Sequence, residues 1–447
     1  MSDRNAARRT LAQVYFAGVD ISKSLRPYLL SLTYTDNEED ETDDLQIKIE
    51  DRDGVWLRKW LDASVQSDIA GGGATGDTGG TGGTGYTVSA KSGLNIRSGP
   101  GTSYAKYGAY AYGTSVDVLE ISGGWAKISY SGKTAYVAAE YLTASGGTEI
   151  ADSSVDKSSS GGVKGLSIQA VILRENWNSD GRDSFLDCGQ FELDNIQASG
   201  PPSTVTIKAT SLPYSSTIRQ MKKSKAWEGY YLSGIANEMA SKAGMAVCYE
   251  SERDPYYDRV EQITEPDIIF LQRLCRDAGI SLKVANNILV LFDQADYERR
   301  NTVFTIAYGV TGYTKWKLDN GEADVKYTSC RVSYTKTSGE VVSGTAYVED
   351  YKANNDNNQC LEITAVVNNA GEAKALAEKM LRAHNKYELT ASFTLPGNPT
   401  LVAGRTVQLK GWGMWNGKYM IKQSKHTVSG SGGYTTQISL RKILEGY

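Results

Sequence analysis

Residues 401–421 read LVAGRTVQLKGWGMWNGKYMI and carry the pattern of two neighbouring β-strands. Apolar residues alternate with polar ones in both halves of the stretch, at Val407, Leu409, Tyr419 and Ile421. This alternation is typical of strands that bury one face. The Asn416-Gly417 pair predicts a tight hairpin, because both residues tolerate a positive φ. The stretch therefore predicts a meander of the kind that builds a β-barrel.

The period of two recurs elsewhere, at Leu45, Ile47 and Ile49 and again at Val205, Ile207 and Ala209. Three segments instead have apolar residues at helical spacing, within 232–240, 268–278 and 373–381. We expect the second helix to open with Thr264 and Asp267 three residues apart, with Pro266 in its first turn, and to end at Gly279. The chain is therefore predicted to be mainly β with an α+β part.

Composition excludes several classes of protein. The 447 residues are enough for about three domains. The 48 Lys and Arg nearly balance the 52 Asp and Glu, so the net charge of −4 gives no sign of a sequence-specific nucleic-acid binder. No apolar stretch approaches the roughly 20 residues that a membrane helix needs, and the N-terminus lacks the apolar run of a signal peptide. We expect a protein that folds in the cytosol without membrane insertion.

Histidine and cysteine are sparse, which limits catalysis and metal binding. The chain has two His, His384 and His426, and five Cys that form no CxxC pair. Neither a zinc site nor a disulfide scaffold is indicated by this spacing. No other pattern points to a bound group, so we predict no catalytic residue, no metal and no cofactor.

Two candidate catalytic residues can be weighed individually. Residues 187–191, DCGQF, are similar to the nucleophile segment of cell-wall cysteine peptidases, which place a thiolate at a helix start near a histidine. Phe191 and Leu193 indicate a strand instead, so we interpret Cys188 as a small buried residue. For His426, which lies just past the strand of Tyr419 and Ile421, a hydrogen-bonded structural role is favoured.

Acidic residues leave two further questions open. The run Glu38–Glu41, followed by Asp43 and Asp44, is interpreted as a solvated loop between strands in preference to a contact with a basic partner. A hydrolase site in the α/β segment remains an alternative, and its candidate residues are Tyr256, Asp258 and Glu261.

Two linkers set a module apart. Residues 71–85 read GGGATGDTGGTGGTG, with nine glycines in fifteen positions. Such a stretch cannot bury enough side chain to offset the entropy lost on ordering, and it predicts a flexible linker. Residues 143–165 are similarly rich in Ser, Gly and Asp. The pair predicts that residues 86–142 form a domain inserted into a surface loop, where long insertions are tolerated.

The inserted module contains the segments GLNIRSGPG at 93–101, GWAKI at 124–128 and GKTAYV at 132–137. These resemble a bacterial SH3 domain, a small β-barrel, and the resemblance implies a targeting role with peptidoglycan as the ligand. Asn95, Trp125 and Tyr136 are the candidate ligand groove. Packing in the core or at the rim is the favoured alternative for both aromatics.

The larger body carries several segments in a characteristic order: QITEPDIIFLQRL at 262–274, FTLPGNP at 393–399, LVAGRTVQL at 401–409, WNGKYMI at 415–421 and YTTQISLR at 434–441. Together these resemble the late control D family, the baseplate hubs of contractile phage tails and phage-tail-like bacteriocins. The resemblance implies two similar β-barrels with a small α/β region between them. Three subunits then make a ring of six barrels that adapts a six-fold tail tube to a three-fold spike.

The predicted organisation is therefore a first hub barrel at 1–70 and 166–225, linkers at 71–85 and 143–165, the SH3-like module at 86–142, an α/β region at 226–300, and a second barrel at 301–447 with a helical insertion near 371–387. Implied partners are two further copies, a central spike protein, tail tube and baseplate wedge proteins, and a tape-measure protein. Such a particle is assembled in the bacterial cytoplasm and released by lysis. The alternatives are a cell-wall-binding protein and a hub-associated peptidoglycan hydrolase.

Trp412, Met414 and Trp415 lie beside the predicted hairpin. They form either an apolar tip that contacts a neighbouring subunit or the spike, or a plug that closes the end of the barrel. The sequence does not distinguish these two roles.

Overall fold

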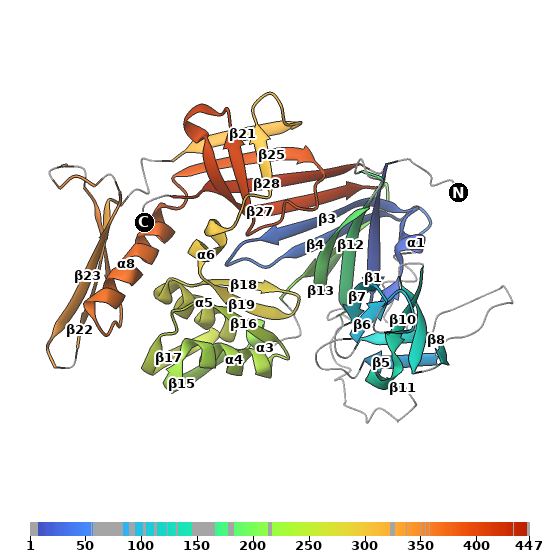
Figure 1. Ribbon diagram of the computed structural model, residues 1–447, viewed down its shortest axis with the longest axis horizontal. Coiled ribbons are helices and arrows are strands. Elements are labelled where there is room, and N and C mark those ends of the chain that lie inside the picture. The colour runs from blue at the N-terminus through green and yellow to red at the C-terminus, as the bar shows by residue number, and fades with distance from the viewer. Residues whose placement is uncertain are drawn as a thin grey trace. The chain divides into compact units, whose positions relative to one another are not determined.

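The computed structural model describes residues 8–54, 56, 84–144 and 166–444, apart from short gaps at 89–93, 102–103, 111–113, 123, 131–132, 178–182, 213–216, 322–326, 337, 350, 354, 357 and 432. The chain forms two compact units, residues 1–63 with 162–447 and residues 64–161 (Figure 1). The two predicted linkers lie almost entirely outside the described residues. Only their inner ends are seen, as the start of one strand and the end of another.

A sheet of 13 strands forms the framework of the larger unit. Its main order is β2-β1-β12-β13-β14-β4-β3-β27-β28-β25-β21, and β26 joins β27 to β20. The first half contains β1 (Arg9–Phe16), β2 (Val19–Asp20), β3 (Leu29–Asn37), β4 (Asp44–Glu50), β12 (Ser167–Glu175), β13 (Ser184–Ser199) and β14 (Thr204–Thr210). The second contains β20 (Phe304–Ala307), β21 (Lys315–Asn320), β25 (Leu389–Pro396), β26 (Thr406–Lys410), β27 (Gly417–Ser429) and β28 (Tyr434–Lys442). The predicted mainly β class is confirmed.

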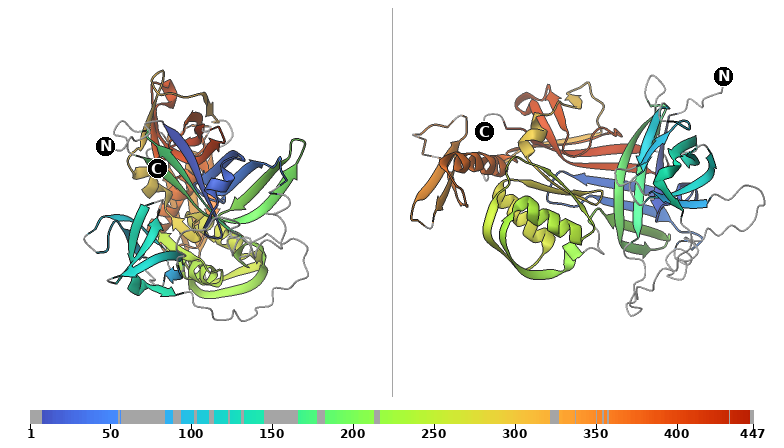
Figure 2. Two further views of the ribbon diagram at one scale, coloured as in Figure 1. Left: turned by 90° about the vertical axis from the view of Figure 1, so that its right-hand side faces the viewer. Right: turned by 60° about the horizontal axis from the view of Figure 1, so that its bottom comes forward.

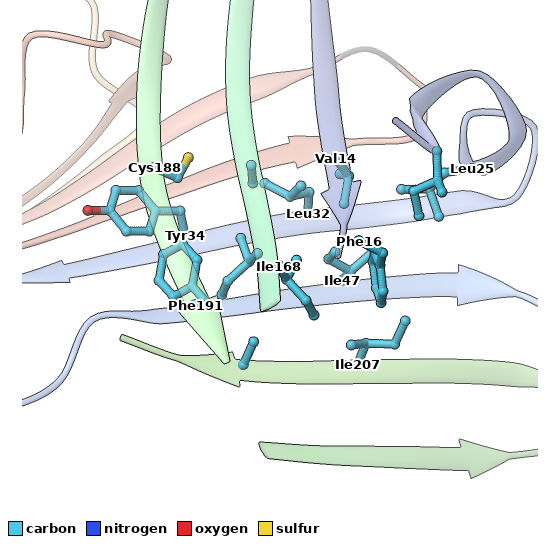
Figure 3. Packing of buried hydrophobic residues seen from close by; sticks show 14 of the residues in the cluster. Val14, Phe16, Leu25, Leu32, Tyr34, Ile47, Ile168, Cys188, Phe191 and Ile207 are labelled. Carbon is cyan, nitrogen blue, oxygen red and sulfur yellow. The ribbon is translucent and has the colours of Figure 1, made fainter. Parts of the chain in front are cut away.

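Each half of the sheet encloses its own apolar core. In the first half, alternate residues of six strands and of the short helix α1 (Ser22–Leu25) point inward, as the period of two predicts (Figure 3). Tyr34 of β3 and Phe191 of β13 meet edge to face with ring centroids 5.8 Å apart. The second core is built in the same way around Phe393, Leu409 and Tyr419. These are the two barrel-like bodies expected from the sequence.

A single ladder joins the two halves. Residues 423–429 of β27 pair antiparallel with residues 31–37 of β3, and His426 lies opposite Tyr34. Backbone hydrogen bonds therefore connect the two bodies directly, which the sequence did not predict. The separation of their cores is retained because β27 bends at the irregular register between Ile421 and Gln423.

β26 and β27 pair antiparallel as predicted, but the tight turn predicted at Asn416-Gly417 is wrong. Asn416 has a φ of −59°, outside the left-handed region that a type I′ turn requires. The connection between β26 and β27 is a longer loop that contains the 3₁₀ turn η4 (Gly413–Trp415), and its positive φ angles fall on Gly411 and Gly413. Glycine supplies these angles without steric strain, so the chain turns there and not at Asn416.

The α/β region consists of two small sheets and four helices. The ribbon of β15 (Lys222–Tyr231) and β17 (Tyr256–Pro266) lies beside the sheet of β16 (Ala246–Glu250), β19 (Ile288–Phe292) and β18 (Ser281–Ala285). The helices are α3 (Thr217–Gln220), α4 (Leu232–Lys242), α5 (Asp267–Ala278) and α6 (Gln294–Arg299). The two longest, α4 and α5, lie side by side in this region (Figure 2). The apolar residues at helical spacing within 232–240 are all buried in α4, namely Leu232, Ile235, Ala236, Met239 and Ala240.

The expected start of α5 needs correction. Thr264 belongs to strand β17 and has a φ of +51°, so it does not cap the helix. Pro266 is the N-cap, and the helix begins at Asp267. The predicted end is confirmed, because Gly279 adopts the left-handed conformation with a φ of +67°.

A fourth part interrupts the second barrel between β21 and β25. The sheet β23-β22-β24, formed by β22 (Ser329–Thr335), β23 (Val341–Tyr347) and β24 (Cys360–Thr364), is covered by α8 (Ala370–Asn385) (Figure 1). The predicted helix near 371–387 is therefore one layer of a larger insertion. A Cβ atom at Gly344 would lie 2.3 Å from the backbone nitrogen of Lys374, so only glycine allows α8 to approach β23 this closely.

Buried ion pairs hold these parts together. Arg441 of β28 makes a bidentate contact with Glu38, which follows β3, at 2.6 and 3.1 Å. Its third nitrogen donates to Glu298 of α6 at 2.5 Å, and Arg382 of α8 donates to the second oxygen of the same carboxylate at 2.6 Å. Arg441 and Glu38 are each only 1% exposed. This cluster therefore joins both barrels, the α/β region and the insertion.

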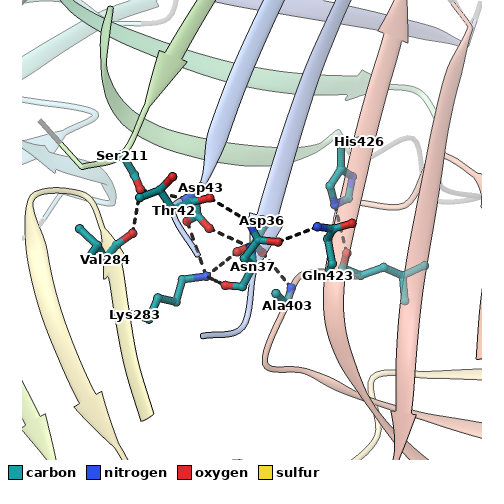
Figure 4. A network of polar contacts seen from close by, with 11 residues as sticks. Asp36, Asn37, Thr42, Asp43, Ser211, Lys283, Val284, Ala403, Gln423 and His426 are labelled. Carbon is teal, nitrogen blue, oxygen red and sulfur yellow. Dashed lines mark hydrogen bonds and ion pairs between the residues drawn. The ribbon is translucent and has the colours of Figure 1, made fainter. Parts of the chain in front are cut away.

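A second cluster lies between the first barrel and β18. Lys283 reaches the carboxylates of Asp36 and Asp43 and donates to the backbone oxygen of Asn37 at 2.6 Å (Figure 4). Burial raises the pKa of Asp43 to about 7, and the two neighbouring carboxylates raise the pKa of Lys283 against its own burial. The second oxygen of Asp36 accepts from the backbone of Ala403 at 2.8 Å, which adds the second barrel to the contact.

The acidic run is therefore not the solvated loop that the sequence favoured. Glu38 and Asp43 are buried, and Glu39 pairs with Lys386 and accepts from Ser281. Only Asp40, Glu41 and Asp44 are exposed. The basic partner of this run belongs to the same chain.

The smaller unit is the inserted module. It contains β5 (Thr84–Val88), β6 (Leu94–Arg97), β7 (Lys106–Tyr110), β8 (Ser115–Ser122), β9 (Trp125–Tyr130), β10 (Lys133–Ala138), the turn η3 (Ala139–Tyr141) and β11 (Leu142–Ala144). These pair in the order β11-β5-β8-β9-β10-β6-β7 around a core of small and β-branched residues. The first strand pairs with the last, as expected of a closed domain whose two ends lie close together.

Replacing Arg441 with Met should destabilise the larger unit by about 3–5 kcal/mol, because Glu38 and Glu298 would remain buried without a counter-charge. Urea unfolding of the full chain measures this loss. Arg52→Met is the matched control, because Arg52 is 76% exposed in its pair with Glu50 and should change stability little. Equal unfolding midpoints for the two variants would show that the cluster does not hold the parts together.

Candidate binding and assembly surfaces

The strand register places the predicted ligand residues of the module on one face. Trp125 of β9 lies opposite Ala138 of β10, and Tyr136 lies opposite both Lys127 of β9 and Arg97 of β6. Side chains directly opposite each other, and those two residues apart, share a face of a sheet. Asn95, two residues before Arg97, therefore joins the same face. We call Asn95, Arg97, Trp125, Lys127 and Tyr136 the module face.

The module face is the outer face of its sheet. The intervening residues of the same strands, such as Ile96, Ile128 and Val137, are fully buried in the core. Trp125 and Tyr136 are half-buried and are not members of that core, and Asn95 is exposed. Both aromatics therefore lie at the surface, where a flat apolar ring with a polar edge is suited to contact a ligand.

Sequence analysis missed the two cations of this face. Arg97 and Lys127 flank Tyr136 on either side in the register. The sequence contained a signal for Arg97. Leu94 and Ile96 alternate with Asn95 and Arg97, and this period of two places Asn95 and Arg97 on the same face of the strand. The face thus combines two aromatic rings with two positive charges.

Trp412 closes one end of the second barrel. It is 6% exposed, and its ring contacts those of Phe393, Trp316 and Tyr308 with centroids 5.0–5.3 Å apart. Its indole nitrogen donates to the backbone oxygen of Ile306 at 3.0 Å. For this residue the geometry supports the plug and not the exposed tip.

Met414 and several neighbours are exposed at the same barrel end. Met414 is 55% exposed in η4, whereas Trp415 is half-buried. The loop between β20 and β21 adds Val310, which is 83% exposed, and Tyr308 and Trp316 leave about half of their surface open around the buried Trp412. We call Tyr308, Val310, Trp316 and Met414 the barrel-end patch. Exposed apolar side chains gathered in this way are typical of contact surfaces.

Cys188 is a buried strand residue, as predicted. It lies in β13 and is 5% exposed. Burial, together with the nearby carboxylates of Asp187 and Asp36, raises the pKa of its thiol well above the usual range. A catalytic cysteine needs the opposite shift, toward the thiolate.

His426 is a structural histidine, as predicted, although it lies within β27 and not beyond it. Its Nε2 is 3.0 Å from the backbone oxygen of Leu401, which can only accept, so Nε2 carries the proton. Nδ1 then accepts from the Tyr434 hydroxyl at 2.8 Å. Burial lowers the pKa of the ring to about 4. Both nitrogens are satisfied in the neutral form, and the ring is unsuited to act as a base.

The alternative hydrolase residues lie on an exposed strand. Tyr256, Asp258 and Glu261 are all at the surface of β17. The ring of Tyr256 packs on Tyr231 with centroids 5.1 Å apart, and Glu261 pairs with Arg259 at 2.6 Å. Neither contact forms an enclosed catalytic site.

Within the described ranges, no cluster of three or more His, Cys, Asp or Glu side chains is arranged to bind a metal ion. No helix among those residues is long and apolar enough to span a membrane.

Comparison with known proteins gives separate results for the two units. Residues 92–143 match the bacterial SH3 domain family. A Bacillus subtilis (strain 168) protein, YrvJ, named as an N-acetylmuramoyl-L-alanine amidase, is 31% identical over 138 residues. That match covers 29% of this chain and 25% of the amidase, so the chain spans about a quarter of this relative.

Solved structures resemble the whole chain. A tail protein of Neisseria meningitidis MC58 aligns with a TM-score of 0.55 and 9% identity over 97% of each chain. The 43 kDa tail protein of prophage MuSo2 from Shewanella oneidensis aligns with a TM-score of 0.50 and 11% identity, over 98% of this chain and 97% of that one. These comparisons confirm the resemblance to phage tail proteins at the level of the fold.

The neutral state of His426 makes stability depend on pH. In the unfolded chain this residue takes up a proton near pH 6.5, whereas in the folded protein it does so near pH 4. The contribution of His426 to the free energy of unfolding is therefore fully present above pH 6.5. It falls by roughly 3 kcal/mol as the pH is lowered to 4. Measured by urea unfolding, the stability difference between the wild type and His426→Gln should shrink by about this amount over that range. His384→Gln, at an exposed position, should show a much smaller change, and equal pH profiles for the two variants would contradict the assignment.

Proposed function

We propose that this chain is the structural hub of a contractile tail baseplate, in a phage or a phage-tail-like particle, and that its SH3 domain binds peptidoglycan. The observation that supports this most strongly is the fold itself. Two barrel-like bodies share one continuous sheet, and the whole chain aligns with a phage tail protein. A ring of three such chains presents six similar bodies to a six-fold tube and a three-fold surface to a spike.

The mechanism is assembly and requires no chemistry. Two bodies joined by a backbone ladder and by buried ion pairs form a rigid block, which a load-bearing ring needs. The partners are two further copies, the central spike, the tail tube and baseplate wedge proteins, and the tape-measure protein. Interfaces in a permanent ring should exceed roughly 2,000 Å². The particle is assembled in the bacterial cytoplasm and released by lysis.

We assign no enzymatic activity to the chain. A cysteine peptidase needs a thiol of low pKa and an accessible base. Burial raises the pKa of the Cys188 thiol and lowers that of the His426 ring, so neither residue meets this need. The match to an amidase covers only 25% of that protein, so it assigns no activity to this chain. Together with the match to the bacterial SH3 family it supports a cell-wall ligand. A peptidoglycan hydrolase remains the second candidate, and zymography on purified cell walls tests it. Clearing that disappears in Asp258→Asn would establish the enzyme and contradict our proposal.

The barrel-end patch is the proposed contact with a neighbouring subunit or the spike. Replacing both Val310 and Met414 with Asp places two charges in an apolar contact, so incorporation into purified particles should fall by at least about tenfold. Val341→Asp, at a 61% exposed position on β23, is the control and should incorporate normally.

Quantitative mass spectrometry of the particle should find three copies per baseplate. One or six copies would refute the ring.

The module face is the proposed peptidoglycan site. The full chain should sediment with purified peptidoglycan, and Trp125→Ala or Tyr136→Ala should weaken this binding about tenfold, because central aromatic residues dominate contacts of this kind. Tyr141→Ala removes an aromatic side chain outside the module face that is 45% exposed, and it should leave binding unchanged. Absence of retention by the wild type, or equal losses for all three variants, would rule out the targeting role.

A further inference from the structure

A hollow of about 280 Å³ opens between the first barrel and the α/β region. Its walls come from the loop between β3 and β4, from helix α5 and from strand β18, with Leu212 after β14 and Arg219 of α3 completing the lining. Both parts belong to the larger unit and are held together by the Lys283 cluster at the base of the same loop. The hollow is therefore a fixed feature of the fold. Neither the barrel-end patch nor the module face contributes to it.

The interior of the hollow is apolar. Leu282 and Val284 of β18 form one wall, and Ile268 and Ile269 of α5 form the other. Ile269 is 49% exposed, whereas its neighbour Ile268 is 5% exposed and packs into the core. An isoleucine in the first turn of a helix is thus left facing solvent at the mouth of an apolar cavity. An inserted apolar side chain would remove this surface from water.

The mouth of the hollow is acidic and rigidly built. Asp40 donates its N–H to the Leu282 oxygen at 3.0 Å, and its own carbonyl accepts from Gln272 at 3.2 Å. These bonds fix the loop to both walls and hold Asp40 at a φ of +58°. Glu41 is exposed beside it.

The charges around the mouth favour a cation. Burial and the carboxylate of Glu39 raise the pKa of Asp40, whereas Lys386 and Arg276 lower it. Lys386 is already paired with Glu39, and Arg276 also acts on the carboxyl of Asp277. Arg219, the cation of the wall, has a carboxylate of its own in Asp194 at 3.6 Å. Asp40 and Glu41 therefore give the mouth an excess of negative charge.

We propose that this hollow receives a segment of a partner protein that inserts one aliphatic or aromatic side chain with a lysine or arginine next to it. Its volume lies just below the range of roughly 300–1,000 Å³ for small-molecule sites, which suits a single side chain better than a free ligand. Charge complementarity at the mouth selects the basic neighbour. The surface is separate from those of the proposed function and does not depend on that assignment.

Fluorescein-labelled hexapeptides test the proposal, with leucine, isoleucine or phenylalanine at the centre and either lysine or glutamate on both sides. Fluorescence anisotropy with the full chain should show binding of the lysine-flanked peptides at least about tenfold tighter than that of the glutamate-flanked ones. The preference should weaken with added salt, as for other exposed charges. Equal binding of both sets, or of neither, would overturn the proposal.

Matched variants locate the binding. Ile269→Ala removes the apolar contact. Asp40→Asn removes a negative charge at a positive φ that asparagine also tolerates. Each variant should bind the lysine-flanked peptides several-fold more weakly. The controls are Ile263→Ala, at a 68% exposed isoleucine of β17, and Asp258→Asn, at an exposed carboxylate of the same strand. Circular dichroism confirms that each variant is folded. The inference would be refuted if these variants lost no more affinity for the peptides than the controls do. It would also be refuted if sedimentation showed that the hollow joins two copies of the chain. Either result would stand even if the ring of three is found.

Discussion

The bidentate pair between Arg441 and Glu38, with Glu298 on the third nitrogen, is the contact on which the arrangement of the larger unit depends. Removing these charges from water costs several kcal/mol per ion, and their attraction offsets this only when the geometry is good and each donor is used. Arg441 meets that condition, since all three guanidinium nitrogens donate to carboxylates. Apolar contacts of similar volume often hold parts of a protein as firmly. They lack the directed bonds by which Arg441 relates Glu38 to Glu298.

The ladder between β3 and β27 complements this cluster. A ladder fixes the register and direction of two strands but leaves the sheet free to twist and bend across it. The Arg441 and Lys283 clusters lie where β3 ends, and they attach the second barrel, the α/β region and α8 to that end. Backbone bonds along β3 and charges at its terminus therefore restrict different motions. Their combination connects four separately packed cores.

The sequence predicted well what depends on local periodicity and poorly what depends on distant partners. Alternation at Leu45–Ile49 and helical spacing at 373–381 identified β4 and α8, because the buried face repeats within a few residues. The acidic run was misjudged because its cations lie about 250 to 400 positions away, at Lys283, Lys386 and Arg441. A run of like charge predicts solvation only when no counter-charge folds onto it. For the module, the aromatic candidates and the alternation that groups Arg97 with Asn95 were visible in the sequence. Placing Arg97 and Lys127 on either side of Tyr136 required the strand register.

The site of the insertion explains how a second domain is accommodated without interrupting the larger sheet. The module lies in the connection from β4 to β12, and these strands are not neighbours in the sheet. The strands of the module that the structure describes pair only with one another, so an insertion at this point interrupts no pairing of the larger sheet. A longer connection adds only the slowly growing entropy of a longer loop. Because the ends of the module pair with each other through β5 and β11, it can fold without contacts from the sheet. Substitutions on the module face therefore leave the ion pairs and the β3–β27 ladder of the larger unit unchanged.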